Sequence, residues 1–423
     1  MVRENNLNER NRRKGMRVKE RNLLPRAAPL FVLFLLFLFV SQPADWSTPK
    51  DFFGVEDFSS EGEARISGIA DKYNLLDYYR EDGELDMLVE TILGRLSDEE
   101  LVSQMVITYF SPRWKDLETV IGLIESKNTG GVIFFEKSNS EVKRLTKEFN
   151  NAAMKSSSIL LPVYSIDGEP SFMQNRFGRA FTLPVAEDIL TVEEASKIAG
   201  TIALLLRRMG IHINYAPVCD ISFNRDIIGL RSFGSDLEQV SELSQAFIQS
   251  TQANGIVATA KHFPGHGSIE GDTHKELVFV EGEPPELAIF QSVIDGGVIS
   301  VMVGHVGVRN HDRFNTEGKP STLSRTIVTD LLKNELGFGG IVVTDAMTMS
   351  AVKSFSLPSY HAARAGCDMI LMPDDELQFI SMVMEEIQRD QDFRKQITDS
   401  VRKIIRLKVC LGLINGQENN EES

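Results

Sequence analysis

The chain has 423 residues, of which 42% are hydrophobic and 25% charged, a composition typical of a globular protein long enough to bury a sizeable core. Its formal net charge is -15, and residues 1–26 carry nine Lys/Arg against three Glu, a net +6, so the remainder carries -21. A body this acidic repels phosphate backbones, which argues against nucleic acid as a partner.

The basic start leads into an unbroken apolar stretch, Leu30 to Val40, followed by a small-residue segment that ends at Ala44. This order of basic, apolar and small residues is typical of a secretory signal peptide. Eleven apolar residues fall short of the roughly 20 needed to span a bilayer. We therefore predict a signal peptide or membrane anchor over residues 1–44, with possible membrane attachment through 27–44, and an exported protein, either periplasmic or extracytoplasmic or anchored to the membrane.

The polar, acidic residues 45–95 are interpreted as a linker and lead-in, and residues 413–423 as a polar tail. Between them, residues 96–412 are predicted to form one catalytic domain. Its first helix is expected at Ser97, because Ser97 and Glu100 form a capping box. The chain's three cysteines are widely spaced and form neither a C-x-x-C motif nor an even set, so we expect each to be a buried apolar residue.

From there the chain alternates short apolar runs with longer segments of helical period. The predicted strands are Val106 to Phe110, Gly131 to Phe135, Leu161 to Asp167, Ile211 to Val218, Ile256 to His262, Ile299 to His305, Gly340 to Asp345 and Cys367 to Met372. The helical candidates between them include Leu117 to Lys127, Val192 to Met209, Leu237 to Ala253, Glu286 to Ile294, Ser324 to Leu336 and Met349 to Ala365.

Continuous rather than alternating hydrophobicity indicates strands that are covered on both faces, as in a parallel sheet. Eight strand and helix units over about 300 residues suit a closed (β/α)₈ TIM barrel of the α/β class. The alternative is an open doubly wound sheet, which more often has a Gly-rich turn after its first strand. No such turn follows Phe110, so the sequence favours the barrel.

Polar residues end five of the predicted strands. They are Asp167, Asp220, Lys261 with His262, His305 and Asp345. Charged side chains are rarely buried without partners, and the chemistry of a barrel gathers at the carboxyl ends of its strands. The coincidence predicts one shared polar pocket there.

A loop after the fifth strand carries two further candidates, Asp272 and His274. Two residues apart in extended chain, they could hydrogen-bond to each other, so that the carboxylate fixes the imidazole tautomer and raises its basicity. A solvated loop pair is the alternative when the two residues are taken alone. The preceding KHFPGHG segment is interrupted by Pro264, Gly265 and Gly267, so its histidines do not form a helical metal pair, and we expect no metal site.

Four motifs stand out in the chain: KHFPGHG with the following DTH, VVTDAMTM, NYAPVCD and the R-S-F-G that starts at Arg231. Together they resemble glycoside hydrolase family 3, and within it the short, single-barrel N-acetylglucosaminidase branch. The resemblance runs from about Leu96 to about residue 412. It implies a retaining glycosidase that releases terminal β-linked N-acetylglucosamine, with peptidoglycan fragments as a possible source, and it implies no cofactor.

The resemblance also implies roles for individual residues. Asp345 matches the nucleophile, His274 the general acid/base and Asp272 its orienting partner. Asp167, Arg231, Lys261 and His262 match groups that bind the terminal sugar. We also expect His305, from its position at a strand end, to contact substrate.

One departure concerns the segment after Asp167, where the family pattern D-x-E-G-G is replaced by Asp-Gly-Glu-Pro170-Ser171. It leaves open a non-catalytic sugar-binding relic of the same fold. A β-glucosidase or a phosphorylase of the same family are the enzymatic alternatives. The aglycone and the oligomeric state are not indicated by the sequence.

Overall fold

The computed structural model describes residues 70, 72–111, 113–135, 138–156, 159–177, 183–223, 228–267 and 276–414, without the side chains of residues 174–177. The expected signal or anchor over residues 1–44, the Asp272 and His274 pair and residues 415–423 of the expected tail lie outside this part of the chain. Among the described residues, no helix combines the length and the apolar character needed to cross a membrane.

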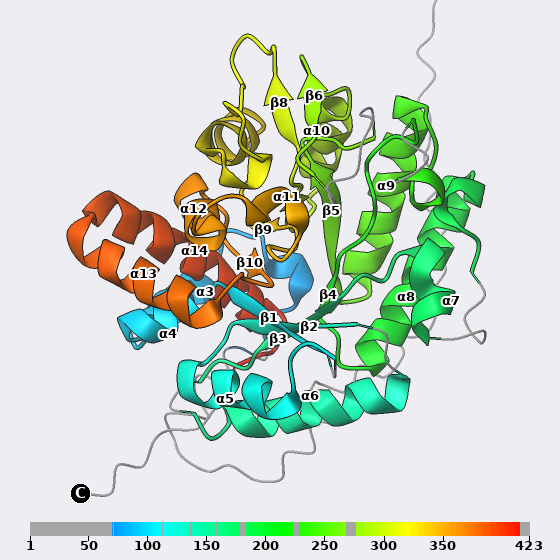
Figure 1. Ribbon diagram of the computed structural model, residues 1–423. Coiled ribbons are helices and arrows are strands. Elements are labelled where there is room, and N and C mark those ends of the chain that lie inside the picture. The colour runs from blue at the N-terminus through cyan, green and yellow to red at the C-terminus, as the bar shows by residue number, and fades with distance from the viewer. Residues whose placement is uncertain are drawn as a thin grey trace, which may run out of the picture. The chain divides into compact units, whose positions relative to one another are not determined.

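Eight strands form a parallel ring in the order β10-β1-β2-β3-β4-β5-β7-β9 (Figure 1). Their bounds are β1 Val106–Phe110, β2 Gly131–Phe134, β3 Val163–Ile166, β4 Ile213–Asn214, β5 Val257–Phe263, β7 Ser300–Val303, β9 Ile341–Thr344 and β10 Ile370–Leu371. A parallel bridge between Val343 and Met369 joins the two ends of this order and closes the ring. The predicted TIM barrel, with all eight strands where the apolar runs place them, is confirmed.

The strands owe their continuous hydrophobicity to burial on both faces. Every residue of β2, β3, β5, β7 and β9 is buried. One face of each strand packs inside the ring and the other against a surrounding helix. Phe149 of helix α6 (Asn139–Ala153), for instance, stacks on Phe134 of β2 with ring centroids 6.1 Å apart.

Helices and short strands complete the domain around this ring (Figure 1). Before β5 they are η1 Leu75–Asp77, α3 Gly83–Leu93, α4 Asp98–Ser103, α5 Leu117–Lys127, α7 Pro170–Phe177, η3 Ala186–Asp188, α8 Val192–Arg208, η4 Gly229–Arg231 and α9 Leu237–Ala253. After β5 they are β6 Phe279–Glu281, α10 Leu287–Asp295, β8 Gly307–Arg309, η5 Ser321–Leu323, the π-helix η6 Thr326–Glu335, α11 Ser350–Lys353, α12 Pro358–Ala365, α13 Glu376–Arg389 and α14 Gln391–Cys410. The predicted capping box at α4 is present, with Ser97 and Glu100 bonding each other's backbone amides.

Two expectations about local structure need correction. The single helix expected from Met349 to Ala365 is two helices: α11 ends at Lys353, and α12 begins at Pro358 after Leu357, whose φ of 51° is left-handed. Proline is favoured at the first position of a helix and disrupts a helix interior. The expected linker over residues 45–95 contains helix α3, whose Leu85 and Ile92 side chains are fully buried and which packs against α14. The folded domain therefore begins upstream of the capping box.

The chain enters and leaves the described domain at the amino-terminal rim of the barrel. Near the start, the Tyr79 hydroxyl donates a hydrogen bond of 2.7 Å to the Val298 carbonyl, which precedes β7. At the end, Ile414 pairs with Leu160, which precedes β3. Both contacts lie on the side opposite the carboxyl ends of the strands.

A group of buried charges also lies at this amino-terminal rim. The Asp368 carboxylate, which is fully buried before β10, accepts hydrogen bonds from Lys333 Nζ at 2.8 Å, Ser400 Oγ at 2.7 Å and the Val342 amide at 2.8 Å. Lys403 Nζ lies 3.5 Å away. We call Asp368, Lys333, Lys403 and Ser400 the basal network. The three cysteines are buried and free, as expected.

Candidate active site

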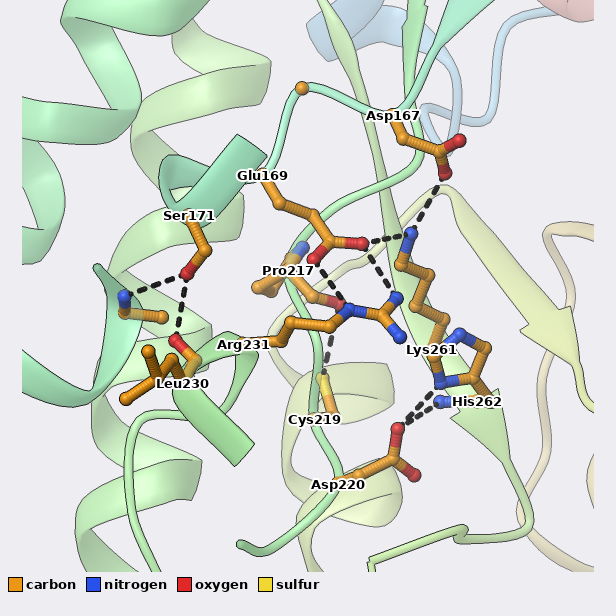
Figure 2. A network of polar contacts seen from close by, with 12 residues as sticks. Asp167, Glu169, Ser171, Pro217, Cys219, Asp220, Leu230, Arg231, Lys261 and His262 are labelled. Carbon is orange, nitrogen blue, oxygen red and sulfur yellow. Dashed lines mark hydrogen bonds and ion pairs between the residues drawn. The ribbon is translucent and has the colours of Figure 1, made fainter. Parts of the chain in front are cut away.

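The carboxyl ends of β3 and β5 bring two of the predicted site residues into contact. Lys261, in β5, donates a hydrogen bond of 2.9 Å to Oδ1 of Asp167, which directly follows β3 (Figure 2). The same ammonium lies 2.6 Å from Oε1 of Glu169. The Lys261 side chain is only 2% exposed, whereas that of Asp167 is 23% exposed. Lys261 is therefore fixed by two carboxylates, and Asp167 is the member of this group that reaches the surface.

Arg231 joins this group through Glu169. Its Nε and Nη2 each donate a hydrogen bond of 2.8 Å to one oxygen of the Glu169 carboxylate (Figure 2). Burial raises the pKa of Glu169, but the adjacent Arg231 and Lys261 outweigh burial and hold that pKa well below its usual value. The carboxylate is thus ionised. We call Asp167, Glu169, Arg231 and Lys261 the substrate-face network.

His262 is held by Asp220, which follows β4. Oδ2 of Asp220 lies 2.6 Å from Nδ1 of His262, and the two oxygens also accept the backbone amides of His262 and His266 at 3.1 and 2.7 Å. Burial raises the pKa of Asp220, but the two histidines and these amides keep it below its usual value. An ionised partner at Nδ1 assigns the ring proton to that nitrogen and leaves Nε2 of His262 for another contact.

Asp345 follows β9 at the same end of the barrel. The backbone amide of Ala346 donates a hydrogen bond of 2.8 Å to Oδ1 of Asp345. Burial raises the pKa of this carboxyl, but the positive potential of His305, His262 and Lys261 lowers it further than burial raises it. Asp345 is therefore a charged carboxylate at neutral pH, as a nucleophile must be.

His305 differs from the expected substrate contact. Its side chain is fully buried, with Nδ1 2.8 Å from the Thr322 hydroxyl and Nε2 3.0 Å from the Ala346 carbonyl. Both ring nitrogens are thus engaged by the protein. This geometry supports a role in which His305 holds the backbone next to Asp345 and favours the charged form of the Asp345 carboxylate, instead of binding a sugar.

Two acidic residues of the site were not predicted as site residues. Glu169 belongs to the D-x-E pattern and could have been found from it, but its interaction with Arg231 spans 62 positions in the sequence. Glu286, before α10, accepts a hydrogen bond of 3.0 Å from the Gly267 amide. Burial, and secondarily Asp220, raises the pKa of Glu286 to about 7. No local pattern marks Glu286, because an acidic residue before a helix is normally a solvated cap.

The glycines of the KHFPGHG segment are explained by this packing. A Cβ on Gly265, whose φ is +141°, would lie 2.3 Å from Oε2 of Glu286. A Cβ on Gly267 would lie 1.9 Å from the Ile221 carbonyl oxygen. The segment that leads from His262 toward residue 268 is thus packed too closely for side chains at these two positions.

Asp272 and His274 fall within residues 268–275, outside the described part of the chain, so their pairing stays a prediction. In the parts of the chain that the structure covers, no group of three or more His, Cys, Asp or Glu side chains is arranged to hold a metal ion. What the described site offers is a charged carboxylate, Asp345, near an imidazole and a fixed set of hydrogen-bond donors and acceptors. Such a set suits the binding of a polyhydroxylated ligand and attack on its carbon.

The chain is similar to known proteins over most of the barrel. The model of the glycosyl hydrolase family 3 N-terminal domain matches residues 97–407. A β-hexosaminidase of Vibrio cholerae is 32% identical over 263 residues, which cover 59% of this chain and 77% of that protein.

Two solved structures are similar in fold as well. A family 3 β-N-acetylglucosaminidase from a Paenibacillus species has 30% sequence identity and a TM-score of 0.68, covering 75% of this chain and 63% of that one. A β-N-acetylhexosaminidase from Beutenbergia cavernae has 25% identity and a TM-score of 0.65, covering 74% and 98%. The family match over most of the chain, on a closed barrel with its polar residues at the expected rim, places this protein in glycosyl hydrolase family 3.

Proposed function

We propose that this protein is a retaining glycosidase that releases terminal β-linked N-acetylglucosamine. The observation that carries the proposal is the charged Asp345 carboxylate at the same end of the barrel as the substrate-face network. The similarity to β-hexosaminidases and β-N-acetylglucosaminidases supports the sugar specificity.

The proposed reaction has two steps. In the first, an Asp345 oxygen attacks the anomeric carbon while His274 donates its proton to the leaving oxygen, which gives a glycosyl-enzyme ester and the free aglycone. In the second, His274 takes a proton from water, the water oxygen attacks the same carbon, and the bond to Asp345 breaks. Two inversions return the β anomer, and Asp272 would orient His274 throughout.

The substrate-face network would hold the terminal sugar during both steps. Asp167 would accept hydrogen bonds from outer hydroxyl groups, and Arg231 and Lys261 would donate to them. Nε2 of His262, which is not used by Asp220, would make a further contact. Glu169 and Asp220 already fix these side chains, so the side chains lose little conformational entropy when the sugar binds.

Hydrolysis of 4-nitrophenyl N-acetyl-β-D-glucosaminide, followed by proton NMR in deuterated buffer, tests the activity and its stereochemistry together. We expect the β anomer to appear first, and Asp345→Asn to be the inactive matched control. Turnover of the β-glucoside instead would indicate a β-glucosidase, and a sugar phosphate formed only with added phosphate would indicate a phosphorylase. Binding without turnover of any of them would indicate a sugar-binding relic.

The natural substrate is proposed to be a peptidoglycan fragment, because the basic and apolar residues 1–44 favour export. Comparing release of N-acetylglucosamine from muropeptides and from chitobiose tests this choice of aglycone. Fractionation of cells that express the full chain, with and without residues 1–44, tests export and membrane attachment. A full chain recovered entirely from the cytoplasm would contradict the proposed localisation.

A further inference from the structure

The Pro170 and Ser171 pair, which stands where the family pattern has two glycines, begins helix α7. The amides of Phe172 and Met173 donate hydrogen bonds of 2.9 and 3.2 Å to the Glu169 carbonyl, so Glu169 directly precedes the helix. Proline is favoured at the first helical position because its φ is already helical and its missing amide hydrogen is not needed there. The backbone of Glu169 is therefore held by the start of a helix where two glycines would leave it free to move.

The Ser171 side chain links this helix to two other segments. Its hydroxyl donates a hydrogen bond of 2.7 Å to the Leu230 carbonyl in η4 and accepts one of 3.1 Å from the Ala186 amide in η3 (Figure 2). A glycine at this position could make neither bond. The replacement thus adds a connection that the family pattern lacks.

That connection ends one residue before Arg231. The Arg231 guanidinium is bound by Glu169 through Nε and Nη2 and lies over the Phe172 ring, 5.2 Å from its centroid. Its backbone turn is bound by Ser171 through Leu230. All of these restraints come from residues 169–172. The pair with Glu169 uses the Nε hydrogen and one hydrogen of Nη2, so the other Nη2 hydrogen and both Nη1 hydrogens are not part of this pair.

We propose that Ser171 is a positioning residue for substrate binding, whose hydroxyl fixes the turn that carries Arg231 so that the guanidinium meets the hydroxyl groups of the terminal sugar. This rests on the proposed function for the identity of the ligand. The altered segment after Asp167 is then a substitute for the glycine pair that keeps the sugar site, and not a sign that the site is lost.

The test compares Ser171→Ala, which removes the hydroxyl, with Ser171→Thr, which keeps one. Ser250→Ala is the matched control. The Ser250 hydroxyl also joins two elements, donating a hydrogen bond of 2.6 Å from the last turn of α9, just before β5, to the Ser196 carbonyl of α8. For Ser171→Ala we expect KM for the 4-nitrophenyl substrate to rise roughly fivefold with kcat nearly unchanged. A fivefold rise corresponds to the free energy of one lost hydrogen bond. Ser171→Thr, which keeps a hydroxyl, should have a KM close to that of wild type. Ser250→Ala should leave KM unchanged, while lowering the melting temperature by about as much as Ser171→Ala lowers it.

A double-mutant cycle separates positioning from general loosening. In an Arg231→Lys background, Ser171→Ala should change KM by less than about twofold, because the group that it positions has been replaced. The same fivefold rise in that background, or a KM change in Ser250→Ala equal to that in Ser171→Ala, would overturn the proposal.

Calorimetric titration with N-acetylglucosamine keeps the inference separate from the proposed reaction. If the wild type binds the sugar without hydrolysing the aryl glycoside, the hydrolase proposal fails, and the ratio of dissociation constants for Ser171→Ala and wild type still tests Ser171. An unchanged dissociation constant in Ser171→Ala, or no binding by the wild type, would contradict the positioning role.

Discussion

Buried charges are found at both ends of this barrel, but of the two networks the substrate-face network alone has a partly exposed carboxylate. In the basal network, Asp368 is fully buried and its partners are two lysines, a serine and a backbone amide. In the substrate-face network, the carboxylate of Asp167 is 23% exposed. The cations are partly exposed at both ends, Arg231 by 17% and Lys333 and Lys403 by 18% and 26%. The comparison teaches that buried charge alone does not mark a site. A partly exposed carboxylate at the carboxyl ends of the strands does.

The largest difference between the two ends should be seen in turnover when Asp345 is changed. Asp345→Asn keeps an acceptor for the Ala346 amide but removes the nucleophile, so we expect kcat to fall by at least about 10⁴-fold and the melting temperature to change little. Steady-state kinetics and thermal unfolding measure the two effects. A residual rate above one hundredth of wild type would contradict the assignment of Asp345.

The basal network should show the opposite behaviour. Asp368→Asn leaves Lys333 and Lys403 without their buried counter-charge, and we expect the free energy of unfolding to fall by about 3 kcal/mol. Urea unfolding measures the loss, and kcat per folded molecule should stay close to wild type. If Asp368→Asn instead lowered kcat with no loss of stability, the division between the two ends would be wrong.

The predicted proton carrier offers an intermediate effect. His274→Ala should slow hydrolysis of an unactivated aryl glycoside by about 10²-fold, because the leaving oxygen is no longer protonated. With 2,4-dinitrophenol as the leaving group the first step needs little proton donation, so added azide, which needs no general base, should restore part of the turnover. A slowing that is the same for both leaving groups, and that azide does not relieve, would remove His274 from this role.

The smallest effect concerns stability against pH at the amino-terminal rim. Lys408 is fully buried there, its amine donates a hydrogen bond of 2.6 Å to Oε1 of Gln104, and burial lowers its pKa to about 7. Between pH 7 and the ordinary value of 10.5, the unfolded chain binds a proton that the folded chain does not, so this group makes stability rise with pH.

Lys408→Met removes that dependence. Urea unfolding at pH 7, 8 and 9 should show wild type gaining up to about 1.4 kcal/mol per pH unit relative to the variant. Parallel pH dependence in the two proteins would mean that Lys408 titrates normally in the folded state.

The barrel could be predicted from sequence because its signals are local. Apolar runs such as Ile341–Thr344 need burial on both faces wherever they occur, and the rule that parallel strands end at one rim then places Asp167, Lys261 and Asp345 together. Helix α3 could not be predicted with the same ease, because its segment is polar and acidic on one side. Its apolar residues are buried by α14, which lies some 300 residues later in the chain.

The contacts inside the site could not be predicted in the same way. Glu169 and Arg231, or Asp220 and His262, are separated by tens of residues, and no periodicity links them. His305 shows the converse, because a polar residue at a strand end can turn to the protein instead of the ligand. Strand ends thus indicate which residues gather, while the partners of each residue depend on the packed loops.

The barrel's entry and exit at Tyr79 and Ile414 have a practical consequence. A purification tag, a fused reporter or a surface tether joined beyond either point starts from the rim opposite Asp345. A domain tethered at Tyr79 or Ile414 would therefore carry Asp345 and the substrate-face network on the side away from the support, whether a resin or a cell envelope.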